Sequence, residues 1–126
     1  MELKQETLLV IAPHADDEIL GCCGLINKVK ENGGKVFVHV LSIGGFNKIG
    51  FGKIKKESWK AEFLKVIKFL KIDGYDISYF NDKNFLKLDT IPQAELINKI
   101  ELKSKTSLSK IKPTIVAIPT IYSYHQ

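Results

Sequence analysis

A histidine and three acidic residues stand together in the stretch HADDE, at positions 14–18. His14 and Asp17 are three positions apart across an expected strand-to-helix turn, so both side chains can point at one locus. A neutral imidazole and a carboxylate suit a borderline divalent ion such as zinc. Asp16 would then act as a base on a water whose pKa the metal lowers, and Glu18 would orient neighbouring groups or a substrate hydroxyl. A helix cap is the simpler alternative, but a cap needs one Asp rather than four ionisable groups.

Hydrophobic patterns around this stretch predict alternating strands and helices. Continuous apolar runs are typical of strands that are covered on both faces. Such runs occupy residues 7–12, 36–43, 76–80 and 114–118. Apolar residues at helical spacing predict a helix over 57–71, a second one between HADDE and Asn32, and a third that begins near Thr90 with a T-x-x-Q capping box. The order predicts an α/β fold, a Rossmann-like three-layer sandwich with a mostly parallel sheet, in a single domain over residues 1–126.

Three unusual segments follow the predicted strands. HADDE follows the first strand, the glycine-rich segment 44–56 follows the second, and the segment 121–126 with His125 follows the fourth. In parallel sheets, ligands bind outside the carboxyl ends of the strands. We therefore expect all three segments at one edge of the sheet, where they would form a site.

Composition narrows the classes of function. The net charge is +5, and every basic residue is a lysine. Nucleic-acid contacts favour the bidentate guanidinium of arginine, so we expect no nucleic-acid partner. No apolar stretch approaches the ~20 residues of a membrane span, and the N-terminus lacks a signal-peptide layout, so we expect a cytoplasmic protein without a membrane partner. The adjacent Cys22 and Cys23 are expected to be reduced thiols.

The stretch APHADDEILGCCG, residues 12–24, resembles the signature of PIG-L/LmbE-type deacetylases, the zinc-dependent N-acetylglucosaminyl deacetylase family. The segment KPTIVAIPTIYSYHQ, residues 112–126, resembles the strand that leads into the second site motif of that family. The resemblance implies an enzyme that hydrolyses the amide of a small N-acetylated sugar with a zinc cofactor. It also implies that His14 and Asp17 are zinc ligands, that Asp16 is the general base, and that His125 stabilises the oxyanion or acts as an acid.

The sequence departs from the family pattern at several positions. The third zinc ligand of the family would lie beyond Gln126, so the domain is expected to be incomplete at its C-terminus. Trp59 stands where the family often has an arginine, and Ser123 replaces the first aspartate of the second motif. His39 lies within a predicted strand and is expected to be a core residue rather than a substitute ligand. The exposed final strand of such a sheet favours pairing with another chain, as in a homo-oligomer.

Three interpretations stay open at this point. The chain is part of a longer, active deacetylase, or it is a truncated, inactive domain with a weak or absent metal site. The third is a nucleotide- or phosphate-binding module, for which the glycine-rich segment 44–54 is the support. That segment fails the spacing of a P-loop, and the acidic start of the helix after HADDE repels phosphate. We expect the longer, catalytic protein.

Overall fold

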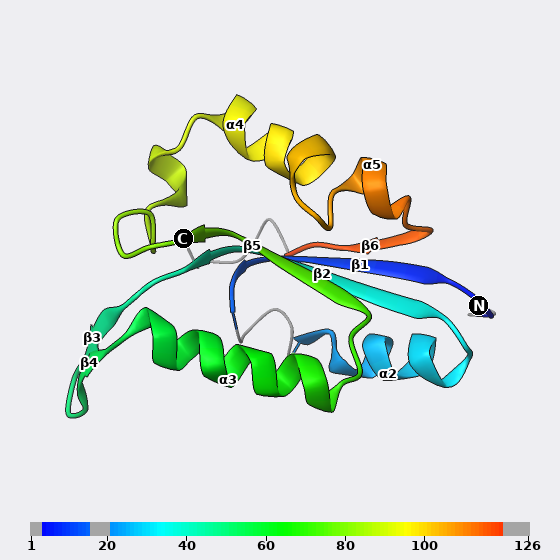
Figure 1. Ribbon diagram of the computed structural model, residues 1–126, viewed down its shortest axis with the longest axis horizontal. Helices are drawn as coiled ribbons and strands as arrows, with labels where there is room; N and C mark the ends of the chain where they lie inside the picture. The colour runs from blue at the N-terminus through cyan, green and yellow to red at the C-terminus, as the bar shows by residue number, and fades with distance from the viewer. Residues whose placement is uncertain (1–3, 16–20, 120–126) are drawn as a thin grey trace.

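The centre of the protein is a four-stranded parallel sheet with the strand order β5-β2-β1-β6. The computed structural model describes residues 4–15 and 21–119. The strands of the sheet are β1 (Thr7–His14), β2 (Lys35–Ile43), β5 (Gly74–Phe80) and β6 (Ile115–Ala117). Helices cover both faces of the sheet (Figure 1). The α/β, Rossmann-like fold with a mostly parallel sheet that the sequence predicts is confirmed.

Two layers of helices enclose the sheet (Figure 1). The helices α2 (Cys23–Glu31) and α3 (Lys56–Phe69) lie on one face. The helices α4 (Gln93–Asn98) and α5 (Leu108–Ile111) lie on the other face, joined by the π-helical turn η2 (Lys99–Lys103). A short 3₁₀ turn, η1 (Leu88–Thr90), precedes α4. Within the two described ranges, no helix has the length and apolar character needed to cross a bilayer.

The main hydrophobic core lies between the sheet and the layer formed by α2 and α3. Alternate residues of β1 and β2 point into it because side chains of a strand alternate between its two faces. These residues are Leu8, Val10, Ala12, Val36, Val38 and Val40, each of them almost fully buried. The helices contribute Ile26 and Val29 from α2 and Phe63 and Ile67 from α3. The apolar periodicity of residues 57–71 thus corresponds to the buried face of α3.

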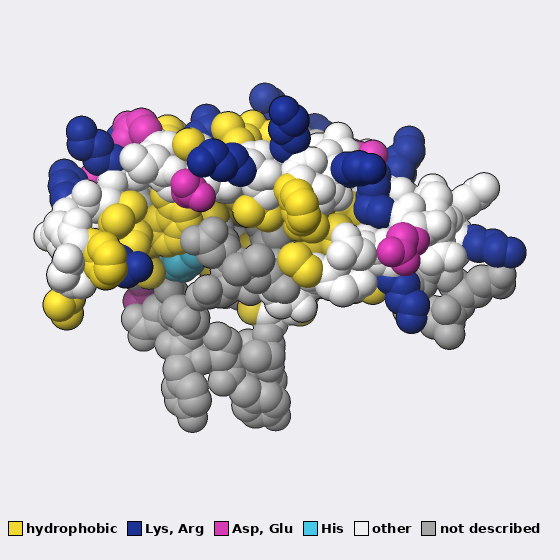
Figure 2. Space-filling view, turned by 90° about the horizontal axis from the view of Figure 1, so that it is seen from below, with side chains coloured by type: hydrophobic (Ala, Val, Ile, Leu, Met, Phe, Trp, Pro, Cys, Tyr) yellow, Lys and Arg dark blue, Asp and Glu magenta, His cyan; other side chains and the backbone are white. Residues whose placement is uncertain are grey.

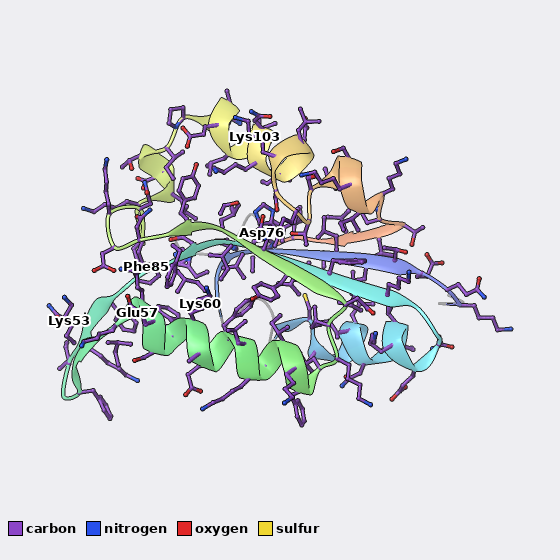
Figure 3. The ribbon with its side chains drawn as sticks, in the orientation of Figure 1. Lys53, Glu57, Lys60, Asp76, Phe85 and Lys103 are labelled. Carbon is purple, nitrogen blue, oxygen red and sulfur yellow. The ribbon has the colours of Figure 1, made fainter. Side chains whose placement is uncertain are left out.

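Polar contacts fix the second helical layer to the opposite face of the sheet. Asp76 on β5 (Figure 3) accepts hydrogen bonds from the Ser104 hydroxyl at 2.8 Å and from the Lys105 amide at 2.9 Å. His39 on β2 is fully buried, and its Nε2 lies 2.6 Å from the Ser78 hydroxyl. Burial lowers the pKa of His39 to about 4, although the charge of Asp76 opposes the shift. The prediction that His39 is a core residue is confirmed.

The segment between β2 and α3 differs from the expectation. Residues 44–56 show no periodicity, yet they contain a two-stranded antiparallel hairpin of β3 (Phe46–Lys48) and β4 (Gly52–Ile54). The hairpin turn contains Gly50 and precedes Gly52, both with positive φ angles that glycine adopts without strain. Strands of three residues are too short for the alternation by which a strand is recognised in a sequence.

The predicted capping box at the start of α4 is wrong. The N-cap residue of α4 is Pro92, and no side chain caps the helix there. Thr90 belongs to η1 instead, and its hydroxyl donates to the Lys87 carbonyl at 2.7 Å. The short 3₁₀ turn therefore uses the hydroxyl that the expected cap requires.

Candidate functional site

The carboxyl ends of three strands form a level row of residues. His14 is the last residue of β1, and it pairs with Ser42 of β2, which in turn pairs with Tyr79 of β5. The Ser42 hydroxyl is buried, and no residue of the described ranges forms a hydrogen bond with it. The loops that follow β2 and β5, with the hairpin β3–β4, lie at the same end of the sheet (Figure 1). The predicted convergence at one edge is therefore confirmed for His14 and the segment 44–56, whereas residues 16–18 and 121–126 lie outside the described residues.

An aromatic cluster packs against His14. The ring of Phe85, in the loop after β5, lies 5.3 Å from the imidazole of His14, centroid to centroid. The Phe85 ring also lies 5.1 Å from the indole of Trp59 on α3 and 5.8 Å from the ring of Phe46 on β3. Phe85 is only 6% exposed, so it is a buried contact between the site histidine, the hairpin and α3. Tilted and edge-on ring pairs at such distances are favourable.

Two glycines allow the loop that carries Phe85 to approach the end of β2. A Cβ on Gly44 would lie 2.3 Å from the Cβ of Phe85 and 2.7 Å from the Asn81 carbonyl oxygen, closer than atoms can pack. The amide of Gly45 donates to Asp82 Oδ1 at 2.8 Å. The loop after β5 is therefore held against the loop after β2 by both packing and a hydrogen bond. This contact determines the position of Phe85 beside His14.

Tyr79, near the end of β5, forms a hydrogen bond with the second helical layer. The Tyr79 hydroxyl donates a hydrogen bond to Glu95 Oε1 of α4 at 2.5 Å, and Lys99 Nζ lies 4.9 Å from the centre of its ring. Burial raises the pKa of Tyr79 well above its usual value, and the hydrogen bond to Glu95 acts in the same direction. Tyr79 therefore stays protonated, which makes it a hydrogen-bond donor rather than a base at neutral pH.

Of the predicted site residues, only His14 lies in the described part of the chain. Asp16, Asp17, Glu18 and His125 lie outside the described residues. Among residues 4–15 and 21–119, no group of three or more His, Cys, Asp or Glu side chains could hold a metal ion. His14 is the last residue of β1, and its imidazole, a type of side chain that can bind zinc, packs against Phe85.

Sequence reasoning placed the segment 44–56 at the site, but it did not identify the hairpin in that segment or the packing of Phe46 and Phe85. One available signal was the Gly44-Gly45 pair directly after β2, since adjacent glycines in a loop often mark a close backbone approach. From below, the molecule shows hydrophobic side chains gathered near a histidine on its surface (Figure 2). The site is therefore more aromatic than the charged stretch HADDE alone suggests.

Comparison with known proteins identifies the family of the chain and agrees with its fold. Residues 9–126 match the PIG-L family model, which is described as GlcNAc-PI de-N-acetylase. The chain belongs to the PIG-L family. No curated protein matches this PIG-L chain.

Two solved structures share the fold. The conserved protein TT1542 from Thermus thermophilus superposes with a TM-score of 0.65 at 24% identity, over 96% of this PIG-L chain and 49% of that protein. A deacetylase in the biosynthesis pathway of teicoplanin, solved as a complex with bog, superposes with a TM-score of 0.63 at 16% identity. That match covers 89% of this chain and 54% of the deacetylase. The chain thus spans about half the length of either structure.

Proposed function

We propose that the protein is a metal-dependent hydrolase that removes an N-acetyl group from an amino-sugar derivative. The observation that carries the proposal is the position of His14 at the carboxyl end of β1, in a chain of the PIG-L family. The family description is that of a de-N-acetylase, which supports a deacetylase-type function. The edge at which His14 lies is also where ligands bind in parallel α/β sheets.

The proposed roles follow the chemistry of the side chains. His14 and Asp17 would hold a zinc ion, which when bound polarises a carbonyl and makes a neighbouring water more acidic. Asp16 would take the proton from the attacking water, and Glu18 would orient a hydroxyl of the substrate. His125 would donate a hydrogen bond to the oxyanion of the tetrahedral intermediate, and the amine would then leave with a proton.

The surroundings of His14 support this chemistry. Packing of Phe85 against the imidazole restricts the ring, and a restricted ligand loses less conformational freedom on binding a metal. The buried Ser42 hydroxyl and the protonated Tyr79 add neutral groups to the same row of strand ends. We further propose that the partner is a small molecule, since a chain without arginine is poorly suited to bind nucleic acid. The proposed compartment is the cytoplasm.

Titration calorimetry with zinc tests the metal part of the proposal. The chain should bind one zinc ion, and His14→Ala should abolish this binding because it removes a proposed ligand. His39→Gln is the matched control, since His39 is buried on β2 away from the strand ends and should not affect zinc binding. Absence of zinc binding by the unmodified chain would favour the inactive-domain interpretation. Equal binding by the chain and by His14→Ala would contradict the assignment of His14.

Release of acetate from an N-acetylglucosamine derivative tests the reaction itself. Asp16→Asn should abolish acetate release while zinc binding persists, because the proposed base accepts a proton but does not hold the metal. Glu31→Gln is the control, since Glu31 is an exposed carboxylate at the end of α2, near the amino end of β2 and away from the candidate site. Full activity in Asp16→Asn would refute the proposed role of Asp16.

A further inference from the structure

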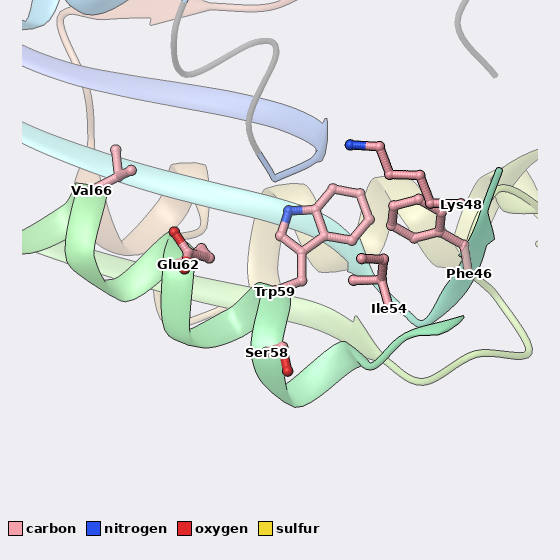
Figure 4. Close-up of a pocket in the computed structure, with 7 residues that line it drawn as sticks. All are labelled: Phe46, Lys48, Ile54, Ser58, Trp59, Glu62 and Val66. Atoms are coloured by element: carbon pink, nitrogen blue, oxygen red, sulfur yellow. The ribbon is translucent and has the colours of Figure 1, made fainter. Parts of the chain in front are cut away.

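A pocket of about 450 Å³ lies between the hairpin β3–β4 and α3, beside the aromatic cluster (Figure 4). This volume is within the range of about 300–1,000 Å³ that is common for small-molecule sites. The hairpin forms one wall and α3 forms the other. The lining residues are Phe46, Lys48, Ile54, Ser58, Trp59, Glu62 and Val66.

Four of the seven residues that line the pocket are apolar, and the other three, Lys48, Ser58 and Glu62, carry polar groups. Phe46 and Trp59 contact each other with ring centroids 5.0 Å apart, and their side chains point into the same space (Figure 4). Ile54 and Val66 extend this apolar surface along the hairpin and the helix. Glu62 is more than half exposed, and its Oε1 lies 3.5 Å from Lys65 Nζ, so its charge is partly offset at the rim. The apolar part of this surface suits a flat ring, which can stack on Phe46 and Trp59.

One side chain, that of Phe85, lies between the pocket wall and His14. Phe85 contacts Trp59 on one side and His14 on the other, at centroid distances of 5.1 Å and 5.3 Å. The Trp59 wall of the pocket therefore lies one aromatic side chain away from His14, a separation that a sugar with its substituent can span. The position of Trp59, where the resemblance leads us to expect an arginine, makes this wall apolar in the present chain.

We infer that this pocket binds a hydrophobic aglycone, of about the size of a phenyl ring, that is attached to the N-acetylated sugar. The sugar part of this inference rests on the proposed function, whereas the pocket itself rests on the geometry of the hairpin and α3. The aglycone ring would stack on Trp59 and Phe46 and displace water from Ile54 and Val66. The sequence alone does not indicate the pocket, because its two walls come from separate elements.

Fluorescence of Trp59, which is the one tryptophan of the chain, measures this binding directly. The probes are methyl and phenyl N-acetyl-β-D-glucosaminide, which differ only in the aglycone. The phenyl glycoside should bind about tenfold more tightly, as expected when an aromatic ring is removed from water. Ile54→Ala should weaken binding of the phenyl glycoside about fivefold and leave the methyl glycoside unchanged, because it removes part of the apolar wall.

A matched variant controls for the substitution. Ile49→Ala changes the same residue type at the tip of the same hairpin, where Ile49 is 99% exposed, and should leave both affinities unchanged. Val66→Ala on α3 provides a second test from the opposite wall, should Ile54→Ala perturb the hairpin. Circular dichroism melting curves identify a variant that no longer folds.

The outcomes separate the pocket from the reaction. Equal affinity for the two glycosides would overturn the inference even if both release acetate, and the proposed function would then stand. Preference for the phenyl glycoside that is lost in Ile54→Ala and Val66→Ala would support the pocket even if no acetate is released. A preference that Ile49→Ala reduces as strongly as Ile54→Ala does would also overturn the inference.

Discussion

Replacing Phe85 by alanine tests whether this side chain holds the loops of the candidate site together. Phe85 is 6% exposed and contacts three rings, those of His14, Trp59 and Phe46. Truncation of a buried phenylalanine usually lowers the free energy of unfolding by about 3–5 kcal/mol. Because Phe85 lies in a loop that can partly collapse onto the gap, we expect a loss of about 3 kcal/mol, at the low end of that range. This is a large share of the about 5–15 kcal/mol that stabilises a typical domain.

Urea denaturation followed by circular dichroism measures the change in stability. Phe69→Ala is the matched control, because Phe69 on α3 is 84% exposed and its loss should change the free energy of unfolding by no more than about 0.5 kcal/mol. The fluorescence of Trp59 should also shift to longer wavelength in Phe85→Ala, since the indole loses its ring contact and gains water. A loss of less than about 1 kcal/mol, or one equal to that of the control, would refute the role assigned to Phe85.

Three other predictions concern the residues that support this arrangement. Gly44→Ala should lower the free energy of unfolding by about 1–3 kcal/mol, because the new Cβ would overlap Phe85. Gly24→Ala on α2 is the control in the same urea assay. Nothing lies within 4 Å of the Cβ that it adds, so it should be neutral or stabilising by up to ~1 kcal/mol. The pKa of His39 is lowered from 6.5 to about 4, so the stability gained from keeping it neutral is fully present above pH 6.5 and is lost as the pH falls towards 4. The loss should reach about 3 kcal/mol in the unmodified chain and should be missing from the stability curve of His39→Gln. Unchanged acid sensitivity in that variant would contradict this. Asp76→Asn should lower the free energy of unfolding by about 1–3 kcal/mol, because the Ser104 and Lys105 donors then face a neutral acceptor. A melting temperature equal to that of the unmodified chain would count against this.

Much of the fold could be predicted because its signals are local. The apolar runs of β1 and β2 are nearly continuous since both faces of these strands are buried, and this pattern is visible in any window of the sequence. The buried residues of α3 recur at helical spacing for the same reason. Where an element is short, as in the hairpin β3–β4 and the 3₁₀ turn before α4, a local pattern is lacking, and the sequence does not predict these elements correctly.

The surroundings of the candidate site could not be predicted in this way. Phe85 lies in the segment 81–87, which has no periodicity, and its partners His14, Phe46 and Trp59 come from three other parts of the chain. Nothing in the types or spacing of these residues indicates that they meet. They meet because the parallel strands bring the end of β1 and the loops after β2 and β5 to one edge of the sheet.

The sequence by itself determined the class of fold and the kind of chemistry that HADDE could perform. Both follow from properties that a short stretch of chain carries alone: burial periodicity, and the affinity of imidazole and carboxylate groups for a metal ion. Only the tertiary structure decided what surrounds His14, namely the ring of Phe85, and what lies beyond it, the apolar pocket lined by Trp59 and Phe46. Contacts of this kind depend on how distant segments pack, and close packing is a property of the folded chain as a whole.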